Sequence, residues 1–289
     1  MVGGSVWALS LAIVLVAACL HASWNLIVKR DDDKLISAWI IVLTPAVILS
    51  PLLVWTGLPP RAAWPMLLAS GIIHTFYNSW LARAYEHGDL SVVYPIARGL
   101  APLLVALAAP FVLGERLTPL AVAAIVLVGG GICALGLTAH RSRSRLSSLA
   151  WAAATAATTA GYSLVDKMGV MRANALSYVV VLFALNALLM GPLVFRERGW
   201  GQVAAVWRLR RGRLVLGGLS SLGAYLLVLC AMQLTQVSYI AALRESSVVI
   251  GALLGWRVLG EPFGLPRILA AMVVAAGLAL LVLAMRGGG

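Results

Sequence analysis

The sequence predicts an all-α integral membrane protein with ten transmembrane helices, arranged as two inverted five-helix halves around a central cavity. Three observations support this fold class: the composition, a series of long apolar segments, and an internal repeat. Of the 289 residues, 62% are hydrophobic and only 11% are charged, whereas soluble domains have about 25% charged residues. A soluble chain this apolar would expose large adhesive surfaces, so we expect the protein to lie within a membrane.

The apolar segments are each roughly 20 residues long, the length that a helix needs to cross about 30 Å of hydrocarbon. Strands of a membrane barrel would instead alternate in segments of about 10 residues. We expect helices at residues 5–27, 36–56, 64–85, 90–112, 117–138, 149–166, 176–195, 214–234, 236–256 and 265–285. The longest linker, 196–213, is too short for a soluble domain.

The formal net charge of +12 reflects membrane topology rather than nucleic-acid binding. Loops after odd-numbered helices carry 13 Lys and Arg residues, and the opposite side carries 5. The positive-inside rule therefore predicts that loops 139–148 and 196–213 are cytoplasmic and that both termini lie outside. We expect a multi-pass protein of the inner or plasma membrane, in contact with membrane lipids.

The chain repeats itself at an offset of about half its length. The segment "PIARGLAPLLVALAAPFVLGERL" from residue 95 aligns with "AALRESSVVIGALLGWRVLGEPF" from 241, which places Arg98 on Arg244 and repeats "VLGE". Near the start of each half, "WNLIVK" resembles "YSLVDK". Because each half has an odd number of helices, the two copies must cross the bilayer in opposite directions. We expect a first repeat at 1–138, a basic linker at 139–148 and a second repeat at 149–289.

Ten spans in this layout, each half closing on "LGE" before a last helix, resemble the drug/metabolite transporter superfamily of EamA type. The stretches "HASWNLIVK" and "YEHGDLSVVYPIARGLAPLLVAL" are similar to those of the group. The resemblance covers essentially the whole chain. It implies a helical carrier with a central cavity that moves small metabolites, often outward, as the aromatic-amino-acid exporters of the superfamily do. It also implies cytoplasmic termini, which is the reverse of the charge-based orientation.

Polar side chains in midspan are costly and usually face the bundle interior. The residues His21 and Asn25, His74 and Asn78, and Tyr94 and Arg98 form pairs four apart, so each pair shares a helix face. Lys29, Asp166 and Lys167 lie at span ends, where we expect them to reach the interface. The candidate solute-binding residues are Trp24, Asn25, Tyr77, Asn78, Tyr94, Arg98, Tyr162, Tyr225, Tyr239 and Arg244.

Two midspan arginines and one midspan glutamate lead to a specific expectation. An arginine at midspan costs about 2.5–3.5 kcal/mol on insertion scales, and one glutamate cannot neutralise two arginines. We expect Arg98, with Tyr94 beside it, to bind a carboxylate of the solute, and Arg244 to pair with Glu245 or to act in the opposite-facing state. The expected carriers of a coupling proton are His21, His74 and Glu245.

The predicted function is secondary transport, by alternating access, of small amphipathic metabolites such as amino acids, in the direction of export and with protons as a candidate coupling ion. The alternative is a lipid or lipid-linked sugar flippase of the same superfamily. The sequence has no GxSxG or HExxH motif and no midspan carboxylate pair, so we expect no enzyme. The three cysteines lack CxxC spacing, and we expect no metal, no cofactor and a monomer.

Overall fold

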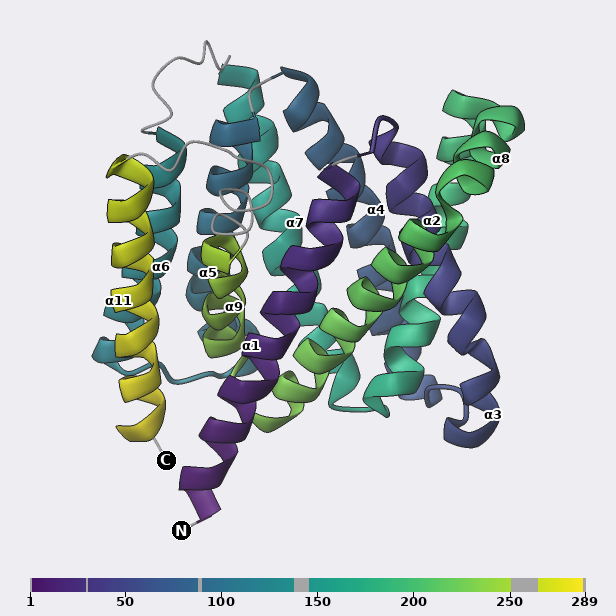
Figure 1. Ribbon diagram of the computed structural model, residues 1–289. Coiled ribbons are helices and arrows are strands. Elements are labelled where there is room, and N and C mark those ends of the chain that lie inside the picture. Colours follow the sequence, from purple (N-terminus) through teal and green to yellow (C-terminus); the bar gives the residue numbers. More distant parts are fainter. Residues whose placement is uncertain (1, 30, 88–89, 138–145, 251–264, 288–289) are drawn as a thin grey trace.

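The computed structural model describes residues 2–29, 31–87, 90–137, 146–250 and 265–287 (Figure 1). Within these ranges the chain is helical and contains no strand, as predicted. Five helices there are long and apolar enough, by length and composition, to cross a membrane. The prediction of an all-helical, multi-pass membrane protein is therefore confirmed.

The first half contains five principal helices that fall on the five spans predicted for it. They are α1 (Val2–Lys29), α2 (Lys34–Leu49), α4 (Trp64–His87), α5 (Leu90–Leu113) and α6 (Pro119–Leu137). Asp33 caps α2 by accepting a hydrogen bond from the backbone N–H of Ile36 at 3.0 Å. A 3₁₀ turn over Ser50–Leu52 continues α2 into the short helix α3 (Leu53–Thr56), and Gly57 ends it with a positive φ of 72°.

The second half departs from the predicted pattern in two places. Its helices are α7 (Leu146–Val170), α8 (Ala175–Leu234), α9 (Val237–Arg244) and α11 (Leu265–Gly287). Helix α8 spans two predicted helices and their linker, with one break at Gly199 (φ 71°, ψ 162°). The linker at 196–213 is helical rather than a loop, because this stretch has no proline and packs Val203 and Val206 against α2 residues such as Ile36.

The second departure is in the predicted span 236–256, where the helix breaks. Helix α9 ends at Arg244, Glu245 forms a turn, and residues 246–250 are helical again. The rest of this span and the second "VLGE" motif lie outside the described residues. The count of ten spans therefore stays a prediction.

Small residues bring the helices into close contact. Helix α5 packs on α6, where a Cβ at Gly99 would lie 2.6 Å from the carbonyl oxygen of Gly129. Helix α6 also packs on α11, where a Cβ at Gly277 would lie 2.9 Å from the backbone nitrogen of Val128. Figure 1 shows α5, α6, α9 and α11 grouped together, with both chain ends on the same side of the molecule. Glycine allows this close approach of backbones in membranes.

The glutamate of the first "VLGE" motif shows how the two repeats are oriented. Glu115, which follows α5, accepts hydrogen bonds from the backbone N–H groups of Val237 (2.5 Å) and Ser238 (3.2 Å) and from the Ser238 hydroxyl (2.6 Å). It thus caps the start of α9. Arg98, in the middle of α5, instead contacts Glu245 at the other end of α9. The repeat-related helices α5 and α9 therefore run antiparallel, as an inverted repeat requires.

Candidate functional site

The break in α9 brings three polar residues into the interior. Glu245 adopts a helical φ and ψ (−70°, −10°), but its N–H turns back to the carbonyls of Ala242 and Leu243, which tightens the last turn. Glu245, Ser246 and Ser247 are all buried. Discontinuous helices of this kind form solute sites in secondary transporters.

Glu245 forms a buried, bidentate ion pair with Arg98. The distance from Arg98 Nη2 to Glu245 Oε1 is 3.0 Å, and Arg98 Nε donates to Oε2 at 3.1 Å. Arg98 Nη2 also lies 3.4 Å from the Ser247 hydroxyl. The expected pairing of Glu245 with Arg244 is therefore wrong, because neighbouring helical residues point about 100° apart and α9 turns Glu245 toward α5.

Arg244 has a different environment. Its side chain is buried, and its guanidinium carbon lies 5.7 Å from the centroid of the Tyr225 ring, within cation–π range. Among the described residues, no carboxylate forms an ion pair with it. Of the two repeat-related arginines, Arg244 is therefore the better candidate to receive an anion from outside the protein.

An aromatic cluster surrounds Tyr225 and joins helices α4, α7 and α8. The His74 ring stacks on Tyr162, with centroids 4.1 Å apart and an interplanar angle of 24°. Tyr225 meets His74 edge-on at 5.8 Å, and Tyr77 meets Tyr162 edge-on at 5.9 Å. The structure thus brings together four of the predicted site residues beside Arg244.

Helix α1 adds a histidine and an indole. The His21 and Trp24 rings meet edge-on at 5.1 Å, and His21 is within electrostatic reach of Arg98 and Arg244. The indole Nε1 of Trp24 is buried and has no hydrogen-bond partner in the described part of the chain. Tyr94 is within electrostatic reach of Arg98. These residues extend the polar cluster toward α1 and α5.

Three predicted site residues make contacts elsewhere. The Asn25 side chain donates to the His21 carbonyl in its own helix at 2.8 Å. The Asn78 side chain donates to the sulfur of Met190 on α8 at 3.1 Å. The Tyr239 hydroxyl is hydrogen-bonded to Thr118. The structure gives none of these three a contact with the cluster around Tyr225.

A buried carboxylate at Asp166 is the main feature that the sequence analysis missed. Asp166 is fully buried and accepts hydrogen bonds from the hydroxyls of Tyr178 (2.8 Å) and Tyr225 (2.5 Å). The expectation that it reaches the interface is wrong, because α7 continues to Val170, past the predicted end at 166. One signal was available: Tyr162 and Asp166 are four apart and share a helix face.

The neighbouring lysine does not reach the interface either. The Lys167 ammonium donates to the backbone carbonyls of Met232 and Thr235 at the end of α8, the latter at 2.9 Å. It therefore satisfies carbonyls that a helix end leaves free. The side chain of Lys29, the third residue expected at the interface, lies outside the described part of the structure.

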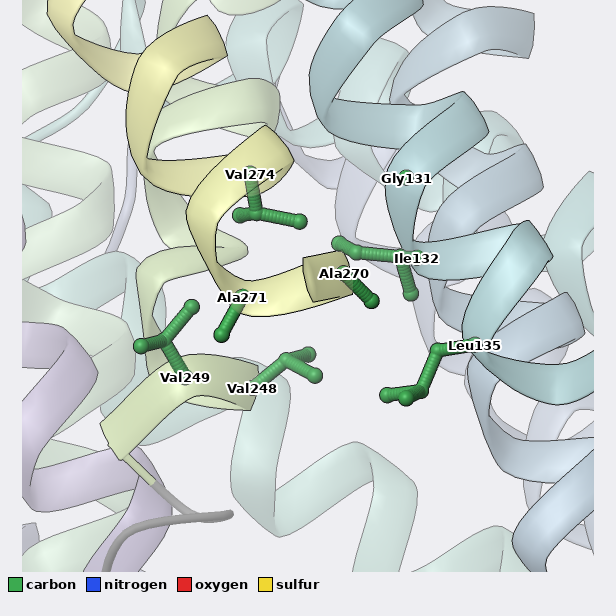
Figure 2. A pocket seen from close by; sticks show the side chains of 8 residues that line it. All are labelled: Gly131, Ile132, Leu135, Val248, Val249, Ala270, Ala271 and Val274. Carbon is green, nitrogen blue, oxygen red and sulfur yellow. The ribbon is translucent and has the colours of Figure 1, made fainter. Parts of the chain in front are cut away.

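A separate pocket lies between α6, residues 248–249 and α11 (Figure 2). It is lined by Gly131, Ile132, Leu135, Val248, Val249, Ala270, Ala271 and Val274. Figure 2 shows these apolar side chains pointing toward one another, with no polar side chain among them. Binding sites orient their ligands with a few polar groups, so the cluster around Arg244 remains the candidate site. In the described ranges, no group of His, Cys, Asp and Glu residues could hold a metal ion.

Comparison with known proteins gives a family and a fold. The model of the EamA-like transporter family matches residues 6–137 and 146–283. Among solved structures, 29 chains match. One of them, described as "Crystal structure of protein", has 19% sequence identity and a TM-score of 0.74, and the match covers 99% of each chain. No curated protein matches the sequence.

Proposed function

The chain belongs to the EamA-like transporter family, and we propose that it is a secondary carrier for a small amphipathic metabolite with a carboxylate group, such as an amino acid. The observation that carries this proposal is Arg244: a buried arginine at the end of α9, with no ion pair to a described carboxylate. A buried charge without a partner is costly. A solute carboxylate that binds and leaves would offset this cost during transport.

The surroundings of Arg244 suit such a solute. A guanidinium binds a carboxylate through two parallel hydrogen bonds. The faces of Tyr162 and Tyr225 offer apolar surface for a hydrophobic or aromatic side chain. The unpartnered indole N–H of Trp24 is a further donor in the same part of the protein. Arg98 takes no solute in this arrangement, because Glu245 already occupies its guanidinium.

For the transport cycle we propose alternating access by the two repeats. The moving units are the halves 1–138 and 149–289, with the basic loop 139–148 between them on the cytoplasmic side of the cell membrane. The broken helix α9 lies where the halves meet, since its start is capped by Glu115 and its end is bound by Arg98. Export is the direction that we propose, in keeping with the family resemblance.

The flippase alternative has less support. A phosphate headgroup is best bound by several arginines or lysines at once. Within the described residues, Glu245 engages Arg98, and backbone carbonyls engage Lys167. That leaves Arg244 as a single cation in the cluster, which matches one carboxylate better than a phosphate.

The test uses purified protein in liposomes, with exchange of labelled L-phenylalanine as the probe reaction. We expect Arg244→Gln to abolish exchange and Arg244→Lys to restore little of it, because lysine lacks the planar fork. Tyr239→Phe is the matched control, because Tyr239 is buried outside the cluster. Phenylalanine amide, which lacks the carboxylate, should not compete. Normal exchange by Arg244→Gln, or competition by the amide equal to that of L-phenylalanine, would refute the proposal.

A further inference from the structure

Asp166 is a buried charge that the proposed solute site does not use. Its side chain is fully buried in α7, and its hydrogen-bond partners among the described residues are hydroxyls, those of Tyr178 and Tyr225 from α8 and of Ser70 from α4. Lys167 follows it directly, but the lysine ammonium is bound to backbone carbonyls of α8. Across the described ranges, no arginine or lysine forms an ion pair with Asp166. An acid held by neutral donors alone can gain and lose a proton without breaking an ion pair.

The contacts of Asp166 lead to the solute site by two routes. On one, the Ser70 hydroxyl bonds to Asp166 and lies 3.2 Å from His74 Nδ1. His74 Nδ1 is also 2.9 Å from the Ser70 carbonyl, which can only accept, so this contact is a hydrogen bond when Nδ1 carries the proton. On the other route, Tyr225 donates to Asp166, and its ring lies under the Arg244 guanidinium.

The two ends of this network lie at different depths. Asp166 is four residues from the end of α7, or about 6 Å at 1.5 Å per residue. His74 is ten residues into α4, or about 15 Å from the start of that helix. The end of α7 and the start of α4 both lie on the side of the molecule that holds the chain ends (Figure 1). The network therefore runs from near the end of α7 to the level of the aromatic cluster.

The charges of the cluster give the sign of the coupling. The titratable groups that interact with Asp166 are His74 on α4 and Tyr178 and Tyr225 on α8. His74 and Tyr225 also interact with Arg244, which is in turn within electrostatic reach of Arg98 and Glu245. The 3₁₀ turn Arg61–Ala63 also packs on α7 and brings Arg61, which forms no ion pair with Asp166 among the described residues. Arg98 and Glu245 neutralise each other. Tyr225 contacts both Asp166 and Arg244, so an ionised Asp166 offsets part of the positive charge on Arg244 and a protonated Asp166 does not.

We propose that Asp166 is the coupling-proton site of the carrier, and that protonation of Asp166 and binding of the solute carboxylate at Arg244 favour each other. This inference rests on the proposed function. A proton from water converts the Asp166 carboxylate to a carboxylic acid, and one positive charge then remains in the cluster. The solute carboxylate pairs with that charge at Arg244, so the proton and the solute cross together.

The proton site belongs to one half of the protein only. The first repeat has Val28 where the second has Asp166, because "WNLIVK" aligns with "YSLVDK". Each chain would therefore carry one proton with each solute molecule. Net movement follows the two gradients together, and it is outward whenever the solute gradient exceeds an inward proton gradient. Of the expected proton carriers, His74 keeps a role as the relay, whereas Glu245 is held by Arg98.

The proton site is tested by infrared spectroscopy of the full chain in lipid vesicles, without any need to know the solute. Acidification should produce the C=O band of a protonated carboxylic acid. We expect Asp166→Asn to abolish this band, and the exposed-site control Asp32→Asn to keep it. A wild-type protein without the band, or a band that survives Asp166→Asn, would overturn the proposal.

The coupling is tested by transport of L-phenylalanine in the same vesicles. We expect an acidic exterior to stimulate uptake by the wild type. In Asp166→Asn the ratio of uptake with the gradient to uptake without it should fall to unity, while exchange in the absence of a gradient persists. Asp166→Glu should restore the stimulation. If the wild type exchanges L-phenylalanine at the same rate with and without a proton gradient, the coupling is refuted and the proposed function is not. No exchange at all would contradict the proposed function, and the infrared band would still decide the proton site.

Discussion

Breaking the Arg98–Glu245 pair should destabilise the protein strongly. Both side chains are almost fully buried, with 7% and 4% of their surface exposed, and two contacts of 3.0 and 3.1 Å join them. Glu245→Gln keeps the volume but leaves the guanidinium without a counter-charge. Removing one partner of a buried pair costs about 3–5 kcal/mol, which is roughly two to four powers of ten in the folding equilibrium at about 1.4 kcal/mol per tenfold.

The double variant Arg98→Met with Glu245→Leu should recover most of this loss, because apolar replacement of both partners leaves no buried charge. The assay is thermal unfolding in detergent, followed by tryptophan fluorescence, for both single variants and the double variant. The matched control is Arg198→Gln, which removes the partly exposed pair with Asp33 at 2.8 Å and should cost less than about 1 kcal/mol. If Glu245→Gln unfolds at the wild-type temperature, or if the effects of the two single variants simply add, the pair does not hold the helices as inferred.

Three further outcomes are expected. Glu115→Ala should lower the melting temperature by the equivalent of about 1 kcal/mol, because it uncaps α9, and Glu115→Asp should lower it less if the cap is the cause. Arg210→Gln should destabilise the protein, because it leaves the buried Asp31 carboxylate without the cation that lies 2.6 Å from it. Added salt screens the attraction between the two charges, so it should lower the melting temperature of the wild type toward that of this variant. Single cysteines at Ser142 and Gln202, in a chain freed of its native cysteines, should resist an impermeant thiol reagent in intact cells, and ready labelling would reverse the charge-based orientation.

The sequence predicted the fold well because bilayer thickness fixes helix length. The prediction failed in two segments: one where a helix continues beyond the bilayer span, and one where a helix breaks within it. The stretch 196–213 is polar enough to leave the bilayer, yet its valines pack on α2 and keep it helical. The break at Glu245 was equally invisible, since "LRESSV" contains neither glycine nor proline to mark it. Tertiary contacts, rather than local propensity, decide both segments.

The sequence predicted which residues form the candidate site better than it predicted the contacts between them. Residue type and spacing were enough to select His74, Tyr162 and Tyr225, because aromatic and polar side chains in midspan have few other places to face. The pairing of Glu245 with Arg98 instead depends on how α9 is rotated, which periodicity does not specify over eight residues. Asp166 was misplaced because α7 ends four residues later than hydropathy suggested.

The cap on α9 also constrains the order in which the protein is made. The backbone N–H groups at the start of α9 find their acceptor in Glu115, which the ribosome adds 122 residues before Val237. When α9 emerges, the end of α5 must already be in place to receive it, or polar groups enter the hydrocarbon unsatisfied. A second half synthesised alone therefore lacks the acceptor for its own broken helix, so the first half must be present when the second half folds.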